Sequence, residues 1–126
     1  MFNEDSIMDY DDFNNIENKI KSLRNEIFFL DYPIPMYKKK TWDNIDFLLY
    51  TYLNNIEDGI ANLGTYYYRP YGWQNKKNWD KRMNFSYKDV NRWWNNLNLI
   101  QNEIIKHTEN LKFNNNVYFD NTTIFG

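Results

Sequence analysis

Side chains that could do acid–base or metal chemistry are few in this sequence. His107 is the only histidine, so two imidazoles of one chain cannot bind the same metal ion. It shares a helical stripe with Ile104 and Leu111, which favours a packed or interfacial imidazole over a catalytic one. The acidic residues within 9–12 lack the glycine and the alternating oxygen ligands of a calcium loop. They suit a helix start, where the helix dipole attracts negative charge.

The sequence signatures of common catalytic sites are absent as well. The chain has no cysteine, which excludes disulfides, thiol catalysis and cysteine-bound metals. It contains no P-loop, no dinucleotide-binding glycine pattern, no nucleophile elbow and no HExxH motif. We therefore predict that the protein is not an enzyme and that it uses no cofactor.

The densest aromatic stretch, residues 66–79, is the strongest candidate for a binding surface. In one interpretation its rings are buried against a neighbouring protein, since interfaces are enriched in Tyr, Trp and Phe. In the other, the rings stack on sugar rings while Gln74, Asn75 and Asn78 bond to the sugar hydroxyls. The candidate interface or glycan-stacking residues are Tyr66, Tyr67, Tyr68, Tyr71 and Trp73.

The elements that position these side chains follow from a threefold repeat. Three segments align without gaps, and each opens on an aromatic residue, Phe2, Trp42 or Trp79. In each segment a tyrosine stands eight residues after the leading ring, and an asparagine stands four residues after the tyrosine. We interpret these residues as a scaffold, because rings repeated in register are usually core. The scaffold residues are Trp42 and Trp79, Tyr10, Tyr50 and Tyr87, and Asn14, Asn54 and Asn91.

The apolar residues of each repeat recur at steps of three and four, the period of one face of an α-helix. This spacing predicts three amphipathic helices, near residues 10–30, 50–63 and 87–111. The residues before each helix are predicted to form an extended arm or turn that folds the leading ring back onto the helix start. The three tyrosines are predicted to occupy equivalent places at the helix starts, with the matching asparagines bonding to backbone groups nearby.

The ends of the helices are predicted from capping residues. Asp9 and Ser86 are predicted to cap the first and third helices by accepting hydrogen bonds from amides three residues later. The second helix has Leu49 at the corresponding position, which predicts a weaker start. Gly64 is predicted to end that helix as a left-handed cap.

Length and composition bound the architecture. A chain of 126 residues that is 42% hydrophobic and 20% aromatic supports one domain with a packed core. We predict a mainly α fold of three repeated amphipathic helical units that form a small bundle, with aromatic-rich linkers and a short β-prone C-terminal tail. The predicted single domain spans residues 1–126, with repeats at about 2–30, 42–64 and 79–111 and the tail at 112–126.

Charge and hydropathy limit the partners. A net charge of -2 leaves no positive surplus for binding a phosphate backbone, so nucleic acid is not expected. No apolar run approaches the roughly 18 residues that a membrane span needs, and the acidic first residues are unlike a signal peptide. The expected partners are therefore other proteins or glycans, not nucleic acid or a membrane.

Two of the repeat units resemble a known sequence pattern. The units Trp42–Ile60 and Trp79–Trp93 are similar to a Trp followed by a Tyr-x-x-(Leu/Phe/Val)-Asn-Arg-(Ile/Trp)-Glu-like helix start. That pattern recurs in tail, baseplate or fibre-associated virion proteins of tailed phages and prophages of low-GC Gram-positive bacteria. The first unit departs from it with Phe2 in place of Trp, and the third unit has Trp94 where Glu is usual.

The resemblance implies a non-enzymatic virion structural protein, in tail or baseplate, that is assembled in the host bacterial cytoplasm. It implies other virion proteins as partners, in a homo- or hetero-oligomer. Two alternatives stay open. The protein could be a carbohydrate-binding or receptor-recognition module that binds a host surface glycan through residues 66–79, or it could be a capsid decoration or head–tail collar protein.

Overall fold

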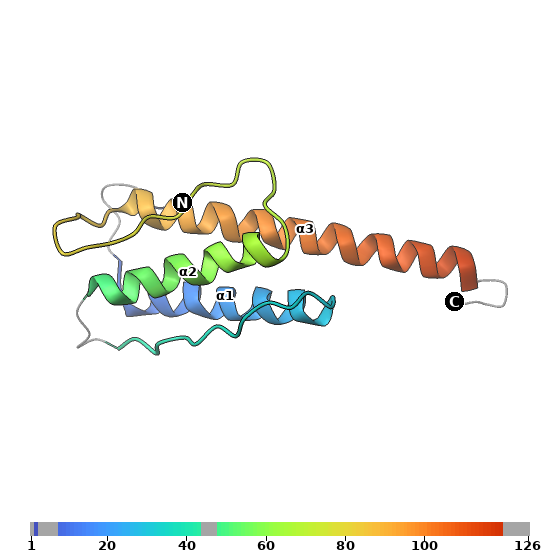
Figure 1. The fold of residues 1–126 in the computed structure, drawn as a ribbon, viewed down its shortest axis with the longest axis horizontal. Helices are drawn as coiled ribbons and strands as arrows, with labels where there is room; N and C mark the ends of the chain where they lie inside the picture. The colour runs from blue at the N-terminus through green and yellow to red at the C-terminus, as the bar shows by residue number, and fades with distance from the viewer. Residues whose placement is uncertain (1, 3–7, 44–47, 120–126) are drawn as a thin grey trace.

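The structure is a computed structural model that describes residues 2, 8–43 and 48–119. Within these residues it consists of three helices, α1 (Tyr10–Phe29), α2 (Tyr50–Tyr66) and α3 (Tyr87–Phe119), and no strand. The helices pack as a small bundle and run in the same direction, from left to right in Figure 1. The predicted mainly α, three-helix fold is confirmed.

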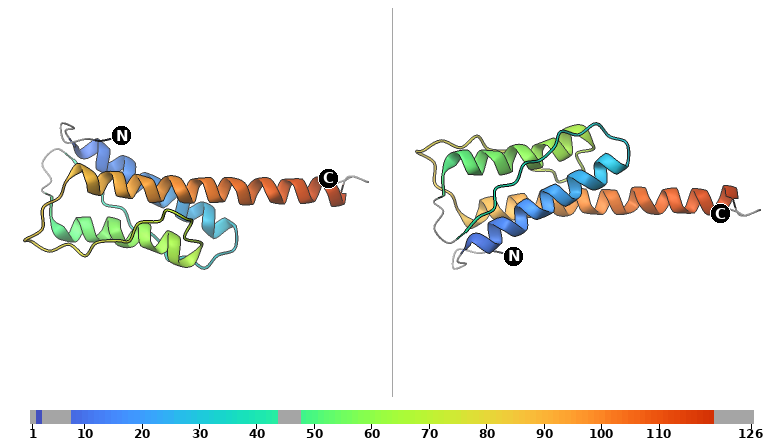
Figure 2. Two further views of the ribbon diagram at one scale, coloured as in Figure 1. Left: turned by 90° about the horizontal axis from the view of Figure 1, so that it is seen from above. Right: turned by 90° about the horizontal axis from the view of Figure 1, so that it is seen from below.

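Because all three helices run in the same direction, the chain must return twice to the end where they begin. The first return segment (residues 31–43) runs back along α1, and the second (residues 67–85) runs back along α2 (Figures 1 and 2). Both contain prolines, which keep the preceding residue out of helical geometry. The buried side chain of Arg24 holds the first return segment by donating to the carbonyl oxygens of Ile34 (2.8 Å) and Pro35 (3.0 Å).

The helix starts agree with the repeat. The first residues of α1, α2 and α3 are the three repeated tyrosines, Tyr10, Tyr50 and Tyr87. The prediction that these residues occupy equivalent places is therefore confirmed. Tyr10 and Tyr50 are exposed and Tyr87 is half-buried, so their rings contribute less to the core than the rings that lead each repeat.

The caps are partly as predicted. Asp9 accepts a hydrogen bond from the amide of Asp12 (3.2 Å), and the Asp12 carboxylate accepts one from the amide of Asp9 (3.0 Å). Such a cap stabilises a helix by about 1 kcal/mol. At α2, Leu49 provides no side-chain cap, as expected. At α3 the Oγ of Ser86 accepts from the amide of Lys88 (3.2 Å), one residue earlier than predicted.

The predicted cap at Gly64 is wrong. The helix α2 continues to Tyr66, and its C-cap is Tyr67. A Cβ atom on Gly64 would lie 2.8 Å from Cζ2 of Trp73, closer than non-bonded carbon atoms pack in proteins. Glycine is needed here because the second return segment brings an indole ring directly onto the helix, not because the backbone reverses.

The third helix is much longer than the other two. It has 33 residues, against 20 in α1 and 17 in α2, and it extends well beyond their ends (Figure 2). It ends at Phe119, eight residues later than predicted. Residues 120–126 lie outside the described part of the chain, so the β-prone tail stays a prediction.

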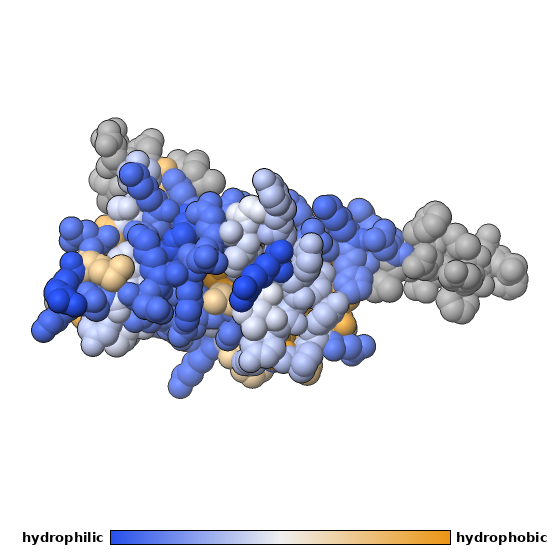
Figure 3. Space-filling view, turned by 45° about the horizontal axis from the view of Figure 1, so that its top comes forward, coloured by the Kyte–Doolittle hydropathy of each residue, from blue (hydrophilic) through white to orange (hydrophobic). Residues whose placement is uncertain are grey.

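The apolar stripes of the three helices meet in one core, as their spacing predicts. The buried residues of the stripes are Phe13, Ile16, Ile20, Leu23 and Ile27 in α1, Leu53, Ile56, Ile60 and Leu63 in α2, and Val90, Trp93, Leu97, Ile100 and Ile104 in α3. The return segments add Ile34, Tyr37, Trp42 and Trp79. The face drawn in Figure 3 is largely hydrophilic, with hydrophobic atoms in small scattered patches. Among the described residues, no helix has the length and apolar character of a membrane span.

Candidate functional site

The repeated asparagines hold the backbone of the repeated rings. Asn14 Oδ1 accepts a hydrogen bond from the amide of Trp42 (2.8 Å), and Asn14 Nδ2 donates to the carbonyl oxygen of the same residue (3.0 Å). We call this pair of bonds an asparagine clamp. The other two clamps are Asn54 with Trp79 (2.7 and 3.0 Å) and Asn91 with Phe2 (3.1 and 2.7 Å). The prediction that these asparagines bond to backbone groups is confirmed in all three repeats.

The clamps connect the repeats in a cycle. We call the contact of α1 with Trp42 the first junction, that of α2 with Trp79 the second, and that of α3 with Phe2 the third. Each helix thus holds the ring that leads the next repeat, and the last helix holds the ring that leads the first. The predicted contact of a ring with its own helix is present in the second repeat, where Trp42 lies edge-on to Tyr52 at 5.4 Å. What the sequence did not indicate is that the preceding helix holds the backbone.

The first junction buries a carboxylate. Glu17 is only 1% exposed and accepts hydrogen bonds from Trp42 Nε1, the Tyr37 hydroxyl (2.8 Å) and the amide of Lys40 (2.9 Å). Burial raises the pKa of Tyr37 above its usual value, and the charge and hydrogen bond of Glu17 raise it further. A Cβ on Gly59 would overlap the Tyr37 ring, so this ring reaches Glu17 only because α2 has a glycine there.

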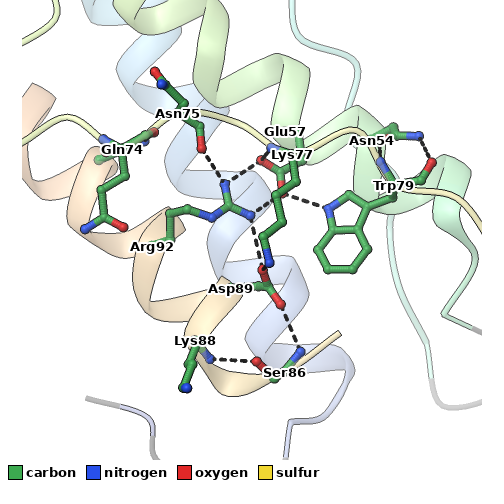
Figure 4. Close-up of polar contacts among 11 residues, drawn as sticks. Asn54, Glu57, Gln74, Asn75, Lys77, Trp79, Ser86, Lys88, Asp89 and Arg92 are labelled. Atoms are coloured by element: carbon green, nitrogen blue, oxygen red, sulfur yellow. Dashed lines mark hydrogen bonds and ion pairs between the residues drawn. The ribbon is translucent and has the colours of Figure 1, made fainter. Parts of the chain in front are cut away.

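The second junction buries the equivalent carboxylate with a cation (Figure 4). Glu57 is also 1% exposed and accepts from Trp79 Nε1 (2.8 Å) and the amide of Lys77 (3.3 Å). The guanidinium of Arg92, on α3, donates to both Glu57 oxygens, at 2.7 and 2.5 Å. Burial alone would lower the pKa of Arg92, but the bonds and charges of Glu57 and then of Asp89 raise it.

The third junction has no such pair. Trp94 stands three residues after Asn91, as Glu17 and Glu57 stand three residues after their asparagines. Phe2 has no indole N–H to donate, so the donor and the acceptor are replaced together. The two departures from the sequence pattern, 92 residues apart, therefore belong to the same junction. A comparison of the repeats shows that positions 2 and 94 change together. That signal in the sequence could have paired each carboxylate with its ring.

The predicted aromatic site separates into packed and exposed rings. Tyr67 is half-buried, and its hydroxyl bonds to His107 Nδ1 (3.2 Å) and donates to the carbonyl oxygen of Glu103 (3.4 Å). Burial raises the pKa of Tyr67 to about 12, with added effects from Tyr32 and Glu103. Trp73 is half-buried over α2. Both rings therefore fasten the second return segment to the bundle.

The exposed rings gather where α1 and α2 end. Tyr66 and Tyr68 are exposed, and Tyr71 is 100% exposed. The sequence analysis missed Phe28 and Phe29, which lie beside the apolar stripe of α1, and Phe29 is 83% exposed. The ring of Tyr32 lies edge-on to that of Tyr67 at 4.9 Å and joins the two helix ends. We define the aromatic end as Phe28, Phe29, Tyr32, Tyr66, Tyr67 and Tyr68; a hollow of about 350 Å³ lies at Phe28, Phe29 and Tyr32.

Gln74 and Asn75 are held through their backbones, while their side chains and that of Asn78 are exposed. The backbone of Gln74 is held by Asn96, whose side chain accepts from the Gln74 amide (2.9 Å) and donates to its carbonyl oxygen (2.7 Å). The carbonyl oxygen of Asn75 accepts from Arg92 (3.5 Å). His107 packs as expected, with its ring parallel to that of Tyr67 at 6.2 Å. Within the described ranges, no three acidic or imidazole side chains gather as a metal site requires.

Comparisons with known proteins found no relative. No protein-family model and no curated protein matches the sequence, and no solved structure matches the fold. Function is therefore inferred from the junctions, the aromatic end and the sequence pattern.

Proposed function

We propose that this protein is a non-enzymatic structural subunit that assembles with other proteins in a phage virion, in the tail or baseplate. The observation that carries the assembly role is the aromatic end, where Phe28, Phe29, Tyr66 and Tyr68 are exposed at the ends of α1 and α2. Exposed aromatic rings are typical of protein interfaces, which are enriched in Phe and Tyr. The virion assignment rests on the resemblance of the repeat units.

The polar residues of the repeat support a structural role. The three asparagines bond to backbone groups, and Glu17 and Glu57 bond to indole N–H groups inside the bundle. These side chains already have partners and are not directed at a substrate. The exposed rings of the aromatic end suit association better than catalysis.

The test is incorporation into particles. We would replace Phe29 and Tyr68 by Asp in the gene carried by the phage or prophage and assay purified particles by mass spectrometry and electron microscopy. We expect the wild-type chain in the tail or baseplate and a strong loss of both variants, because a charge at a buried interface is costly. Met36, which is exposed on the first return segment, gives the matched control Met36→Asp, which should be incorporated normally.

Two results would contradict the proposal. One is a particle that lacks the wild-type chain. The other is equal incorporation of all three variants, each shown by circular dichroism to be folded. Location in the head or collar would support the alternative of a decoration or collar protein with the same assembly chemistry.

A glycan-binding role is the second candidate, and the complete exposure of Tyr71 favours it. A free aromatic face can stack on a sugar ring without any rearrangement. Titration with bacterial surface glycans, followed by calorimetry, should give binding that Tyr71→Ala abolishes. If no glycan binds, or if Tyr71→Ala leaves binding unchanged, this second candidate is wrong.

A further inference from the structure

A carboxylate lies among the rings of the aromatic end. The hollow of about 350 Å³ at that end is lined by Phe28, Phe29, Asp31, Tyr32 and Pro33. Of these five residues only Asp31 is charged, and its side chain is exposed. Its carboxylate makes no hydrogen bond or ion pair with any residue that the structure describes. A largely apolar hollow therefore presents one unpaired negative charge.

The backbone of Asp31 is strained. Its φ of 72° lies in the left-handed region, where side chains other than glycine are crowded by the backbone. The amide of Asp31 donates to the carbonyl oxygen of Phe28 (3.0 Å), and the amide of Tyr32 donates to that of Ile27 (3.4 Å). These two bonds form the Schellman motif that ends α1, and the left-handed residue of this motif is usually glycine. Glycine at position 31 would make the same turn without the strain.

The charge of Asp31 is also unfavourable for folding. The last carbonyl groups of a helix carry partial negative charge, so they repel a carboxylate beside them. The last turn of α1 has no basic residue that would offset this repulsion. Arg24, more than a turn earlier, donates instead to carbonyl oxygens of the first return segment. A residue that carries both a backbone cost and a charge cost points to a role outside folding.

The surroundings of Asp31 suit a cation. The face of an aromatic ring attracts positive charge, most strongly where water is partly excluded. Phe28 already has such a neighbour, because the Arg24 guanidinium lies 4.8 Å from the centroid of its ring. The ring of Phe29 is 83% exposed and so is open to a ligand. A volume of about 350 Å³ is at the lower end of the range for ligand pockets, which suits a single side chain better than an extended ligand.

We propose that the hollow of the aromatic end binds an arginine side chain of the partner protein, with the guanidinium on the Asp31 carboxylate and against the rings of Phe29 and Tyr32. Arginine is favoured over lysine because its planar guanidinium donates two hydrogen bonds to one carboxylate and stacks on aromatic faces. Arginine is also enriched at protein interfaces. The proposal rests on the proposed assembly function and deepens it, because it states the chemistry that the partner presents to the aromatic end.

The test uses the intact chain and a small probe that carries only the proposed group. Protein labelled with ¹⁵N is titrated with N-acetyl-L-arginine amide, and separately with the corresponding citrulline compound, which has a similar shape and no charge. The amide chemical shifts of Phe28, Phe29, Asp31 and Tyr32 are followed by NMR. We expect the arginine compound to move these signals saturably. The citrulline compound should bind about 10-fold more weakly or less, as loss of a charge-assisted hydrogen bond implies.

Two substitutions at position 31 separate binding from folding. Asp31→Gly removes the carboxylate and the strain together, so the thermal midpoint should rise by a few degrees while the affinity for the arginine compound falls about 10-fold or more. Asp31→Asn, which tolerates the same backbone conformation, should lose the same affinity. Glu26→Gln is the matched control, because it removes the same charge from an exposed residue of α1 that does not line the hollow, and it should leave the affinity unchanged.

Three results would overturn the proposal. The arginine compound could move none of these signals up to its solubility limit, the citrulline compound could bind equally well, or Asp31→Gly could keep the wild-type affinity. The particle assay separates such a failure from failure of the proposed function. Incorporation that Phe29→Asp prevents and Asp31→Gly does not would overturn the arginine site alone. A chain that binds the arginine compound through Asp31 but is absent from particles would support the site and overturn the virion assignment.

Discussion

The first and second junctions bury the same carboxylate against the same indole, yet they compensate its charge differently. Glu17 is surrounded by neutral donors, among them the Tyr37 hydroxyl, whereas Glu57 forms a two-bond ion pair with Arg92. The residue of α2 that is equivalent to Arg92 is Asn55, and it donates to the Tyr37 hydroxyl at 3.3 Å instead of reaching the carboxylate. Glu17 is thus bonded by a tyrosine that an asparagine contacts, whereas Glu57 is bonded by an arginine.

The surrounding lysines follow the same difference. Lys77 pairs with the buried carboxylate of Asp89 at 2.7 Å, while Lys40 lies 4.5 Å from the ring centroid of Tyr52, the residue equivalent to Asp89. The carboxylate of the second junction is thus bonded to a cation, whereas the donors described for the carboxylate of the first junction are neutral. All three junctions have the asparagine clamp, and the first two also have the indole–carboxylate bond. The residues around them only need to satisfy the buried charge.

The largest effect is expected from removing the cation of the second junction. Arg92→Ala should lower the free energy of unfolding by about 3–5 kcal/mol, because it leaves Glu57 buried without its counter-charge. The matched substitution at the first junction, Asn55→Ala, should cost only about 1 kcal/mol. Urea unfolding measures both. Adding Glu57→Gln to Arg92→Ala should recover part of the lost stability. Equal costs for Arg92→Ala and Asn55→Ala would show that the two junctions do not differ as described.

Removing a clamp should have the next largest effect. Asn14→Ala and Asn54→Ala each leave a backbone amide and a carbonyl without a partner beside a buried ring, which should cost about 1–3 kcal/mol. Asn91→Ala should cost less, since Phe2 is only half-buried. Thermal unfolding of the three variants under one condition tests this order. A cost for Asn91→Ala as large as the others would mean that the third junction is as firm as the first two.

The third junction can be converted into one of the other type. Phe2→Trp combined with Trp94→Glu should restore the missing indole–carboxylate bond, with a favourable coupling of about 1–2 kcal/mol in a double-mutant cycle. Trp94→Glu alone should destabilise, because it places a carboxylate there without its donor. Additive effects of the two substitutions would show that positions 2 and 94 do not face each other as their counterparts in the other junctions do.

Alkaline pH should distinguish the first junction from the second. The pKa of Tyr37 is raised in the folded state, so above pH of about 10 this hydroxyl ionises only in the unfolded chain, and stability falls by up to about 1.4 kcal/mol per pH unit. Below that pH the contribution is fully present. Tyr37→Phe should remove this part of the slope, whereas Tyr50→Phe, at an exposed ring, should not. Urea midpoints measured between pH 8 and about 11 give the comparison.

Much of the fold could be predicted, because the information lies in short segments. Steps of three and four residues place Ile16, Ile20 and Leu23 on one face, and a polar residue such as Asp9 marks where a helix starts. The role of the asparagines was also predicted, since a polar side chain repeated beside a buried ring must bond to something. Gly64 was misread because a helix-ending glycine and a glycine that admits a ring look the same in sequence.

The residues of the candidate site were harder to predict. Tyr67 and Trp73 appeared in the same stretch as Tyr68 and Tyr71, yet the first two are packed and the last two are exposed. Composition cannot separate them, because the return segment is extended and has no helical period from which the buried side could be deduced. Phe28 and Phe29 were missed because they lie in a helix with a clear period. The apolar stripe of α1 explains its other hydrophobic residues, and these two stand beside it.

By itself, the sequence determined three similar helices, their starting residues, their apolar faces and the positions of the rings and asparagines between them. All of these depend on contacts between residues a few positions apart. The tertiary structure alone decided that the helices are parallel, that each clamps the ring of the next repeat and that Phe2 closes the cycle on α3. Those contacts join residues 25 to 89 positions apart, and they depend on how whole helices and return segments pack together.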